Sequence, residues 1–199
     1  MSYPVSMYPN DASAVAAEVR VLFGKSADKV LAEHGGSARA ILEASRIANG
    51  RGWAQLKAAQ ALQAHALMET LSQKQALTSP RVAREFLSTL IGTLTYEVFV
   101  LLFLDNRHRL ICYREIFRGT VDGASVHPRE VVRESLRVPA CAAVLIAHCH
   151  PSGVAEPSQA DEVITTRLKD ALALVDIRVL DHLIVAGGDC VSLAERGVI

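Results

Sequence analysis

Residues 144–161 read VLIAHCHPSGVAEPSQAD, an apolar run followed by a turn and by the start of a helix. The run Val144–Ala147 has the composition of a buried strand, and His148 and His150 come as it ends. Residues two apart in an extended chain point to the same side, so both imidazoles can converge on one point. The Pro-Ser-Gly segment 151–153 then turns the chain away from the strand.

Asp161 completes a candidate metal site with these two histidines. The pair Pro157-Ser158 opens the next helix, which places Asp161 in its first turn and returns its carboxylate toward the imidazoles. Two imidazoles and one carboxylate form an open site for a catalytic zinc ion, with the fourth position left for water. Cys149 is expected to point away from the site, because side chains alternate along a strand.

Two structural interpretations of the same residues stay open. An H-x-H pair at a strand end also occurs without a metal. Ser158 and Asp161 have the spacing of a capping box, in which both side chains bind helix amides and no metal is needed. The capping interpretation does not exclude the metal site, because a capping serine can still present its hydroxyl to a substrate.

Strands alternate with helices in the second part of the chain, residues 78–199. Ser79 as cap and Pro80 at the first helical position predict a helix that reaches Ile91. Apolar, β-branched or aromatic runs predict four strands, over Val98–Leu104, Leu110–Phe117, Val144–Ala147 and Arg178–Val185. Two further helices are predicted, over Pro128–Leu136 and Gln159–Val175. This alternation indicates an α/β sheet covered by helices.

The first part of the chain, residues 11–77, has a different character. It is rich in alanine and leucine, with apolar residues at helical spacing, which predicts about four short helices and no strand. Glycine-containing breaks at 35–37 and 49–52 separate these helices. Residues 1–10 hold two prolines and two tyrosines without periodicity, and we expect a loose arm there. The domain boundary is therefore placed between residues 77 and 78.

The composition excludes several classes of protein. The chain has 199 residues, 50% of them apolar, and its 21 basic and 21 acidic side chains give a net charge of zero. Such a chain does not act mainly by coating nucleic acid. The longest apolar runs stop well short of a membrane span and no signal peptide is visible, so we expect a cytoplasmic protein with no membrane partner. The four cysteines form no C-x-x-C pair and are expected to be reduced.

The whole string H-x-H-x(7)-S-x(2)-D resembles the signature of the JAMM (JAB/MPN) metallohydrolases, and His148, His150, Ser158 and Asp161 fall on its four positions. The form His-x-His-Pro-Ser-Gly is similar to the RadC branch of that family. Blocks similar to RadC sequences occur in the same order elsewhere, at 119–120, 126–130 and 181–185. The resemblance covers roughly residues 78–199.

The resemblance implies a mixed sheet between helices, of the JAB/MPN type related to cytidine deaminases. It also implies one catalytic zinc ion, held by His148, His150 and Asp161. The reaction class is hydrolysis of an amide, peptide or isopeptide bond, with a peptide or protein as the expected substrate. In this chemistry the Ser158 hydroxyl donates to the developing oxyanion together with the metal.

A second catalytic residue is implied by the same resemblance. The family uses a glutamate at the start of a core strand, which hydrogen-bonds the water at the metal and transfers its proton. Glu97 matches this position, because it leads directly into the strand predicted from Val98. Its structural interpretation is an exposed charge at a strand end. Glu115, Glu130 and Glu134 are lesser rivals for the role.

Two further histidines stand in the RadC-like blocks. His127 and His182 are both expected to pack or to form hydrogen bonds near the site. Asp181-His182 has an alternative role, in which it supports the site by orienting a metal ligand.

The helical part resembles the helix-hairpin-helix unit that commonly precedes this domain in RadC proteins. Gly50-Arg51-Gly52 followed by Lys57-Ala58 is similar to its hairpin, although Arg51 replaces an apolar residue and the spacing before Lys57 is longer. Backbone amides of such a hairpin can hold a phosphate. The resemblance to RadC proteins thus also implies an alternative function, a DNA-repair-associated, nucleic-acid-binding factor with a structural metal site. A helical packing module for self-association as a homo-oligomer, or for a partner protein, stays equally open.

Overall fold

The computed structural model describes residues 12–73, 80–119 and 126–199. The chain divides into two compact units, Met1–Leu62 and Gln63–Ile199, and the division falls within the long helix α4 (Arg51–Gln73). Three predictions fall outside the described residues: the loose arm 1–10, the domain boundary between 77 and 78, and the helix cap Ser79.

Among its described residues, the first unit contains helices joined by turns and no strand. Its elements are α1 (Ala12–Phe23), the 3-10 helix η1 (Gly24–Ser26), α2 (Ala27–Glu33), α3 (Ala38–Ala44) and the first turns of α4. They enclose a small core of Val19, Ala27, Val30, Ile41 and Leu56. The expected short helix after residue 52 is instead part of the 23-residue α4, because neither glycine nor proline interrupts the sequence between Trp53 and Gln73.

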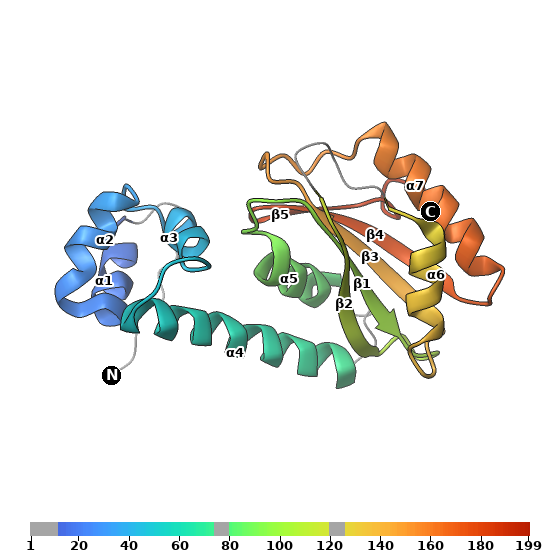
Figure 1. Ribbon diagram of the computed structural model, residues 1–199, viewed down its shortest axis with the longest axis horizontal. Coiled ribbons are helices and arrows are strands. Elements are labelled where there is room, and N and C mark those ends of the chain that lie inside the picture. Colours follow the sequence, from blue (N-terminus) through green and yellow to red (C-terminus); the bar gives the residue numbers. More distant parts are fainter. Residues whose placement is uncertain (1–11, 74–79, 120–125) are drawn as a thin grey trace. The chain divides into compact units, whose positions relative to one another are not determined.

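The second unit contains one five-stranded mixed sheet, in the order β2-β1-β3-β4-β5 (Figure 1). The strands are β1 (Val98–Leu104), β2 (Leu110–Arg118), β3 (Ala143–Cys149), β4 (Arg178–Ala186) and β5 (Asp189–Ser192). Only β3 and β4 are parallel, and the helix α7 (Gln159–Ala173) connects them, as a parallel pair requires. The predicted α/β fold with a mixed sheet between helices is therefore confirmed.

Helices cover both faces of the sheet, which explains why all seven residues of β1 are buried. Val98, Val100, Leu102 and Leu104 pack in one core with α5 (Pro80–Ile91). Phe99, Leu101 and Phe103 pack on the opposite face with α6 (Pro128–Leu136) and α7. Figure 1 shows α5 on one side of the strands and α6 and α7 on the other. The strand period of two thus assigns each residue of β1 to one of two cores.

One strand, β5, was not predicted. It has only four residues, Asp189–Ser192, and its two ends are polar, so it has no apolar run of strand length. It forms because the turn at Gly187-Gly188 brings it back to pair with β4 in antiparallel register. Gly187 has a φ of +62°, which favours glycine.

Candidate metal centre

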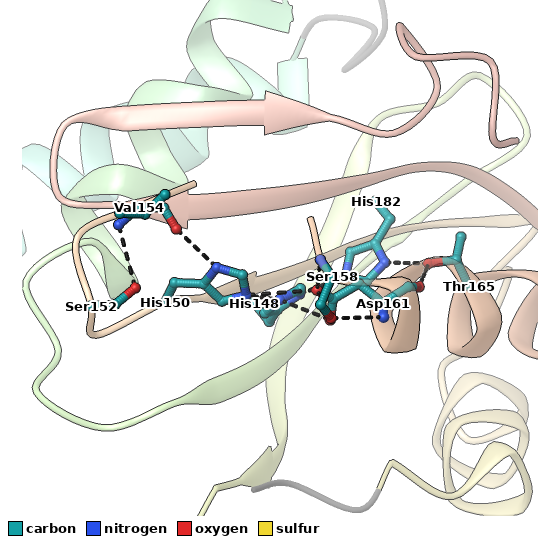
Figure 2. Close-up of polar contacts among 8 residues, drawn as sticks. All are labelled: His148, His150, Ser152, Val154, Ser158, Asp161, Thr165 and His182. Atoms are coloured by element: carbon teal, nitrogen blue, oxygen red, sulfur yellow. Dashed lines mark hydrogen bonds and ion pairs between the residues drawn. The ribbon is translucent and has the colours of Figure 1, made fainter. Parts of the chain in front are cut away.

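Three elements of the second unit meet at the carboxyl end of β3, the central strand of the sheet. His148 is the last residue but one of β3, and His150 follows the strand directly. Val144, Ile146 and His148 alternate onto the face that α7 covers. The loop after His150 leads to α7, whose first turn contains Asp161. Figure 2 shows both imidazoles and the Asp161 carboxylate turned toward one another.

The three side chains form a group that could hold a metal ion. One ligand atom from each of His148, His150 and Asp161 lies within 4.8 Å of the other two. The two imidazole Nε2 atoms are 2.9 Å apart. Asp161 Oδ1 lies 3.3 Å from His148 Nε2, and Asp161 Oδ2 lies 3.7 Å from His150 Nε2. The convergence expected from the H-x-H spacing and the helix start is therefore present.

The site is closed on one side and open on the other. The side chain of His148 is only 1% exposed, whereas those of Asp161 and His150 are 14% and 20% exposed. Phe99, which pairs with His148 across the two strands, stacks on its ring with centroids 6.3 Å apart. A group bound here would have protein on the His148 side and solvent access on the His150 side.

The loop orients His150 through a backbone carbonyl. His150 Nδ1 lies 2.9 Å from the oxygen of Val154, and a carbonyl oxygen only accepts. His150 therefore carries a proton on Nδ1, and in the neutral ring the Nε2 atom has a free lone pair. This is the atom that faces His148 and Asp161.

A capping box orients Asp161. The Ser158 backbone N–H and its hydroxyl both donate to Asp161 Oδ2, at 2.7 and 2.6 Å, and the Asp161 N–H donates to Ser158 Oγ at 3.2 Å. The capping interpretation of these two residues is confirmed. The carboxylate still reaches the histidines, because the cap engages Oδ2 and leaves Oδ1 on the side of His148.

A row of buried polar contacts lies behind His148 (Figure 2). His148 Nδ1 is 2.8 Å from His182 Nε2, and His182 Nδ1 is 2.6 Å from Thr165 Oγ1. The Thr165 hydroxyl is also 2.5 Å from the backbone oxygen of Asp161. His182 and Thr165 are fully buried. His182 therefore forms a hydrogen bond near the site, as the sequence predicts, and its partner is a site histidine.

Burial sets the protonation of both inner histidines. Loss of solvation lowers the pKa of His148 to about 4; the Asp161 carboxylate opposes this shift, and His150 adds to it. The pKa of His182 is also held well below its usual range, mainly by burial and then by the neighbouring His148 and His150. Both rings are therefore neutral near neutral pH.

The metal-free protein is expected to lose stability as the pH falls from about 6.5 toward 4. In this window an unfolded chain binds a proton at His148 that the folded chain rejects, so the free energy of unfolding rises with pH. For His148 the whole window is worth about 3 kcal/mol, and His182 acts in the same direction. Urea titrations at several pH values measure this slope.

Comparison with His148→Gln separates the contribution of His148 from that of Glu97, since burial raises the pKa of Glu97 and its effect on the free energy of unfolding therefore has the opposite sign. The slope is expected to be shallower in this variant and to be retained in His65→Gln, which replaces an exposed histidine on α4. Equal slopes in His148→Gln and the parent protein would contradict the prediction.

Glu97 lies immediately before β1, at the same end of the sheet as the histidines, since Phe99 pairs with His148. Its backbone oxygen accepts from the N–H of Gly119 at 2.8 Å. Burial raises the pKa of its carboxyl, His150 lowers it and Asp161 raises it further. Glu97 is thus close enough to the site for His150 and Asp161 to affect its pKa.

The remaining predicted residues lie outside this group. Cys149 belongs to the opposite core and its thiol lies 3.4 Å from the backbone oxygen of Tyr96, as the strand alternation predicts. His127 precedes α6, and its ring makes a T-shaped contact with that of Phe117. The three rival glutamates, Glu115, Glu130 and Glu134, are each paired with an arginine.

Two residues of the site were not found from the sequence. Thr165 lies four residues after Asp161, and this helical spacing was an available signal that both share one face of α7. The role of Val154 rests on its backbone oxygen, which every residue type carries, so no sequence signal could have identified it.

The sheet order and the helices on both of its faces define an α/β domain with a mixed sheet, which is consistent with the JAB type. A family model described as the RadC-like JAB domain matches residues 77–198. The chain belongs to this RadC-like JAB domain family.

Several proteins named only as UPF0758 proteins are similar to this chain. The one from Marinobacter nauticus is 58% identical over 146 residues, which are 73% of this chain and 65% of that protein. The one from Thioalkalivibrio sulfidiphilus is 54% identical over 171 residues, 82% of this chain and 76% of its own length. The one from Nitrosococcus oceani is 49% identical over 201 residues, 96% and 89% of the two chains. The match therefore spans less than two thirds of the Marinobacter protein and most of the other two.

Among the described residues, no helix combines the length and the apolar character needed to cross a membrane.

Proposed function

We propose that this chain is a zinc-dependent hydrolase of peptide or isopeptide bonds, with His148, His150 and Asp161 as the metal ligands. The observation that carries the proposal is the convergence of two imidazole nitrogens and one carboxylate within 4.8 Å at a partly open site. The donor set fits the metal, because catalytic zinc sites commonly use three nitrogen or oxygen ligands and keep a fourth position for water or substrate. Membership of the RadC-like JAB domain family supports the same assignment.

The surroundings of the ligands also suit a catalytic zinc site. His150 is held by Val154 with Nε2 turned inward, and Asp161 is held by the cap with Oδ1 turned inward. When bound, zinc supplies the Lewis acidity that makes a nucleophile of water near neutral pH. The solvent access on the His150 side leaves room for a substrate carbonyl.

Two side chains of the protein would then handle the protons. Glu97 accepts a proton from the attacking water and delivers it to the leaving amine, a task that its raised pKa favours. The Ser158 hydroxyl donates to the carbonyl oxygen of the substrate as negative charge develops there. For this the hydroxyl turns from Asp161 Oδ2 to the substrate, while the Ser158 backbone N–H keeps its bond to the carboxylate.

Metal content and chelator sensitivity test the proposal. Protein purified without added metal is expected to contain one equivalent of zinc per chain. Inductively coupled plasma mass spectrometry measures this content. Incubation of a protein extract with this enzyme is expected to create new α-amino or ε-amino groups, and a chelator should suppress them until zinc is restored. Protein that binds no transition metal tightly under any condition would refute the metal site.

A further inference from the structure

In the row of hydrogen bonds behind His148, a backbone carbonyl fixes which atom donates and which accepts. Thr165 Oγ1 lies 2.5 Å from the backbone oxygen of Asp161, and a carbonyl oxygen only accepts. The Thr165 hydroxyl proton therefore lies on this bond, as is common for threonine within a helix. The same hydroxyl oxygen can then only accept from His182 Nδ1, 2.6 Å away.

The same assignment of donors and acceptors extends through His182 to His148. A neutral imidazole has one donor and one acceptor, so a proton on His182 Nδ1 leaves Nε2 as an acceptor. His182 Nε2 lies 2.8 Å from His148 Nδ1, which must then carry the proton of the His148 ring. His148 Nε2 is left with a free lone pair on the side of His150 and Asp161.

The reversed assignment of donors and acceptors leaves the contact between Thr165 and Asp161 without a proton. A proton on His148 Nε2 would require His182 to donate from Nε2 and Thr165 to donate to His182. The Thr165 and Asp161 oxygens would then face each other at 2.5 Å with no proton between them. Since Thr165 and His182 are buried, water does not compensate the Thr165 hydroxyl for the lost bond without rearrangement.

We propose that His182 and Thr165 are positioning residues that hold the proton of His148 on Nδ1 and thereby present Nε2 as a ligand atom. The proposal rests on the proposed function only for the identity of the bound ion. Metal-binding histidines generally donate their second ring nitrogen to a carboxylate, a carbonyl or water. Here a second histidine and a threonine stand between that ring nitrogen and the backbone carbonyl of Asp161.

The arrangement favours a cation between the two site histidines. Val154 already fixes the proton of His150 on Nδ1, so both Nε2 atoms present lone pairs to each other at 2.9 Å. Two lone pairs at this distance repel unless a positive ion or a proton lies near both. The protein thus orients its imidazoles from behind, through Val154 on one side and through Thr165 on the other.

Zinc affinity in threonine variants tests the role of Thr165. Thr165→Val removes the hydroxyl at nearly constant volume and is expected to weaken zinc binding toward the lower end of the ~10–100-fold range known for such supporting residues. Thr165→Ser keeps a hydroxyl and is expected to bind as the parent protein does. Competition with a chromophoric chelator measures each affinity.

Ser135→Ala is the matched control for loss of packing. Its hydroxyl is buried and donates to the backbone oxygen of Val131 at 2.8 Å, on α6 and outside the site. It loses a comparable hydroxyl-to-carbonyl bond and is expected to keep the parent's zinc affinity. Parent affinity in Thr165→Val, or an equal loss in Ser135→Ala, would overturn the role of Thr165.

The proton positions themselves are measured by nuclear magnetic resonance, on metal-free parent protein with ¹⁵N-labelled histidine. Long-range nitrogen–proton correlations are expected to show His148 and His182 both protonated on Nδ1, and Thr165→Val is expected to mix the two tautomers. A proton on Nε2 of His148 in the parent protein would overturn the proposal, even if zinc binds. If zinc does not bind, the same spectra still decide the proposal, so the two failures are distinguishable.

Discussion

Removal of both site imidazoles, in His148→Ala/His150→Ala, is expected to abolish tight zinc binding. Structural zinc sites release about 10–16 kcal/mol over four ligands, so each ligand accounts for roughly 3 kcal/mol. Loss of two ligands therefore weakens binding by roughly 10⁴-fold, and Asp161 alone does not retain the ion. Zinc content after purification and the affinity in competition with a chelator measure the effect.

Two histidines of the helical part provide the matched control. His34→Ala/His65→Ala removes two imidazoles from helices, His34 at the end of α2 and His65 on α4, and neither belongs to the group of candidate ligands. This variant is expected to keep the zinc stoichiometry of the parent protein. Zinc retained at the parent affinity in His148→Ala/His150→Ala would show that these imidazoles are not the ligands.

The second large effect is expected from Glu97→Gln, which keeps the shape of the side chain but removes its capacity to accept a proton. Since general acid–base groups contribute about 10²–10⁴-fold to rate, hydrolysis is expected to fall by this factor. Zinc affinity is expected to change little, because Glu97 is not among the converging ligand atoms. Labelling of new amino groups in a protein extract measures activity before a particular substrate is known.

Glu85→Gln serves as the control for the Glu97 variant. Glu85 is an exposed glutamate on α5, paired with Arg81, and its replacement is expected to leave hydrolysis unchanged. The assignment of Glu97 fails if Glu97→Gln holds zinc and retains the parent rate. It equally fails if the variant loses its zinc, because Glu97 would then act as a ligand.

The sheet could be predicted well from the sequence because its strands carry strong local signals. Both β1 and β3 are continuous apolar runs, which is typical of strands covered on both faces. The strand β5 has no such run, and it exists only because β4 lies beside it. The length of α4 was missed for a different reason, since alanine-rich sequence predicts helix well but does not show where one helix ends.

The site could likewise be predicted only in part from local sequence patterns. His148, His150 and Asp161 were placed by the periods of strand and helix, which are local properties of the chain. Contacts that join distant segments could not be read in this way. The distance from His148 to His182 depends on the pairing of β3 with β4, 34 residues later in the chain. The hydrogen bond from His150 Nδ1 to the Val154 carbonyl depends on the path of the loop between them.

The first two turns of α7 combine tasks that are usually separate. Ser158 starts the helix, Asp161 supplies a carboxylate, and the Asp161 carbonyl accepts from Thr165. The S-x(2)-D part of the family signature is therefore also an ordinary helix-start pattern, and by itself it cannot tell a metal site from a capped helix. The hydroxyl one turn later adds a position, S-x(2)-D-x(3)-T. This longer string gives a criterion for distinguishing relatives with a supported histidine from those that keep only the cap.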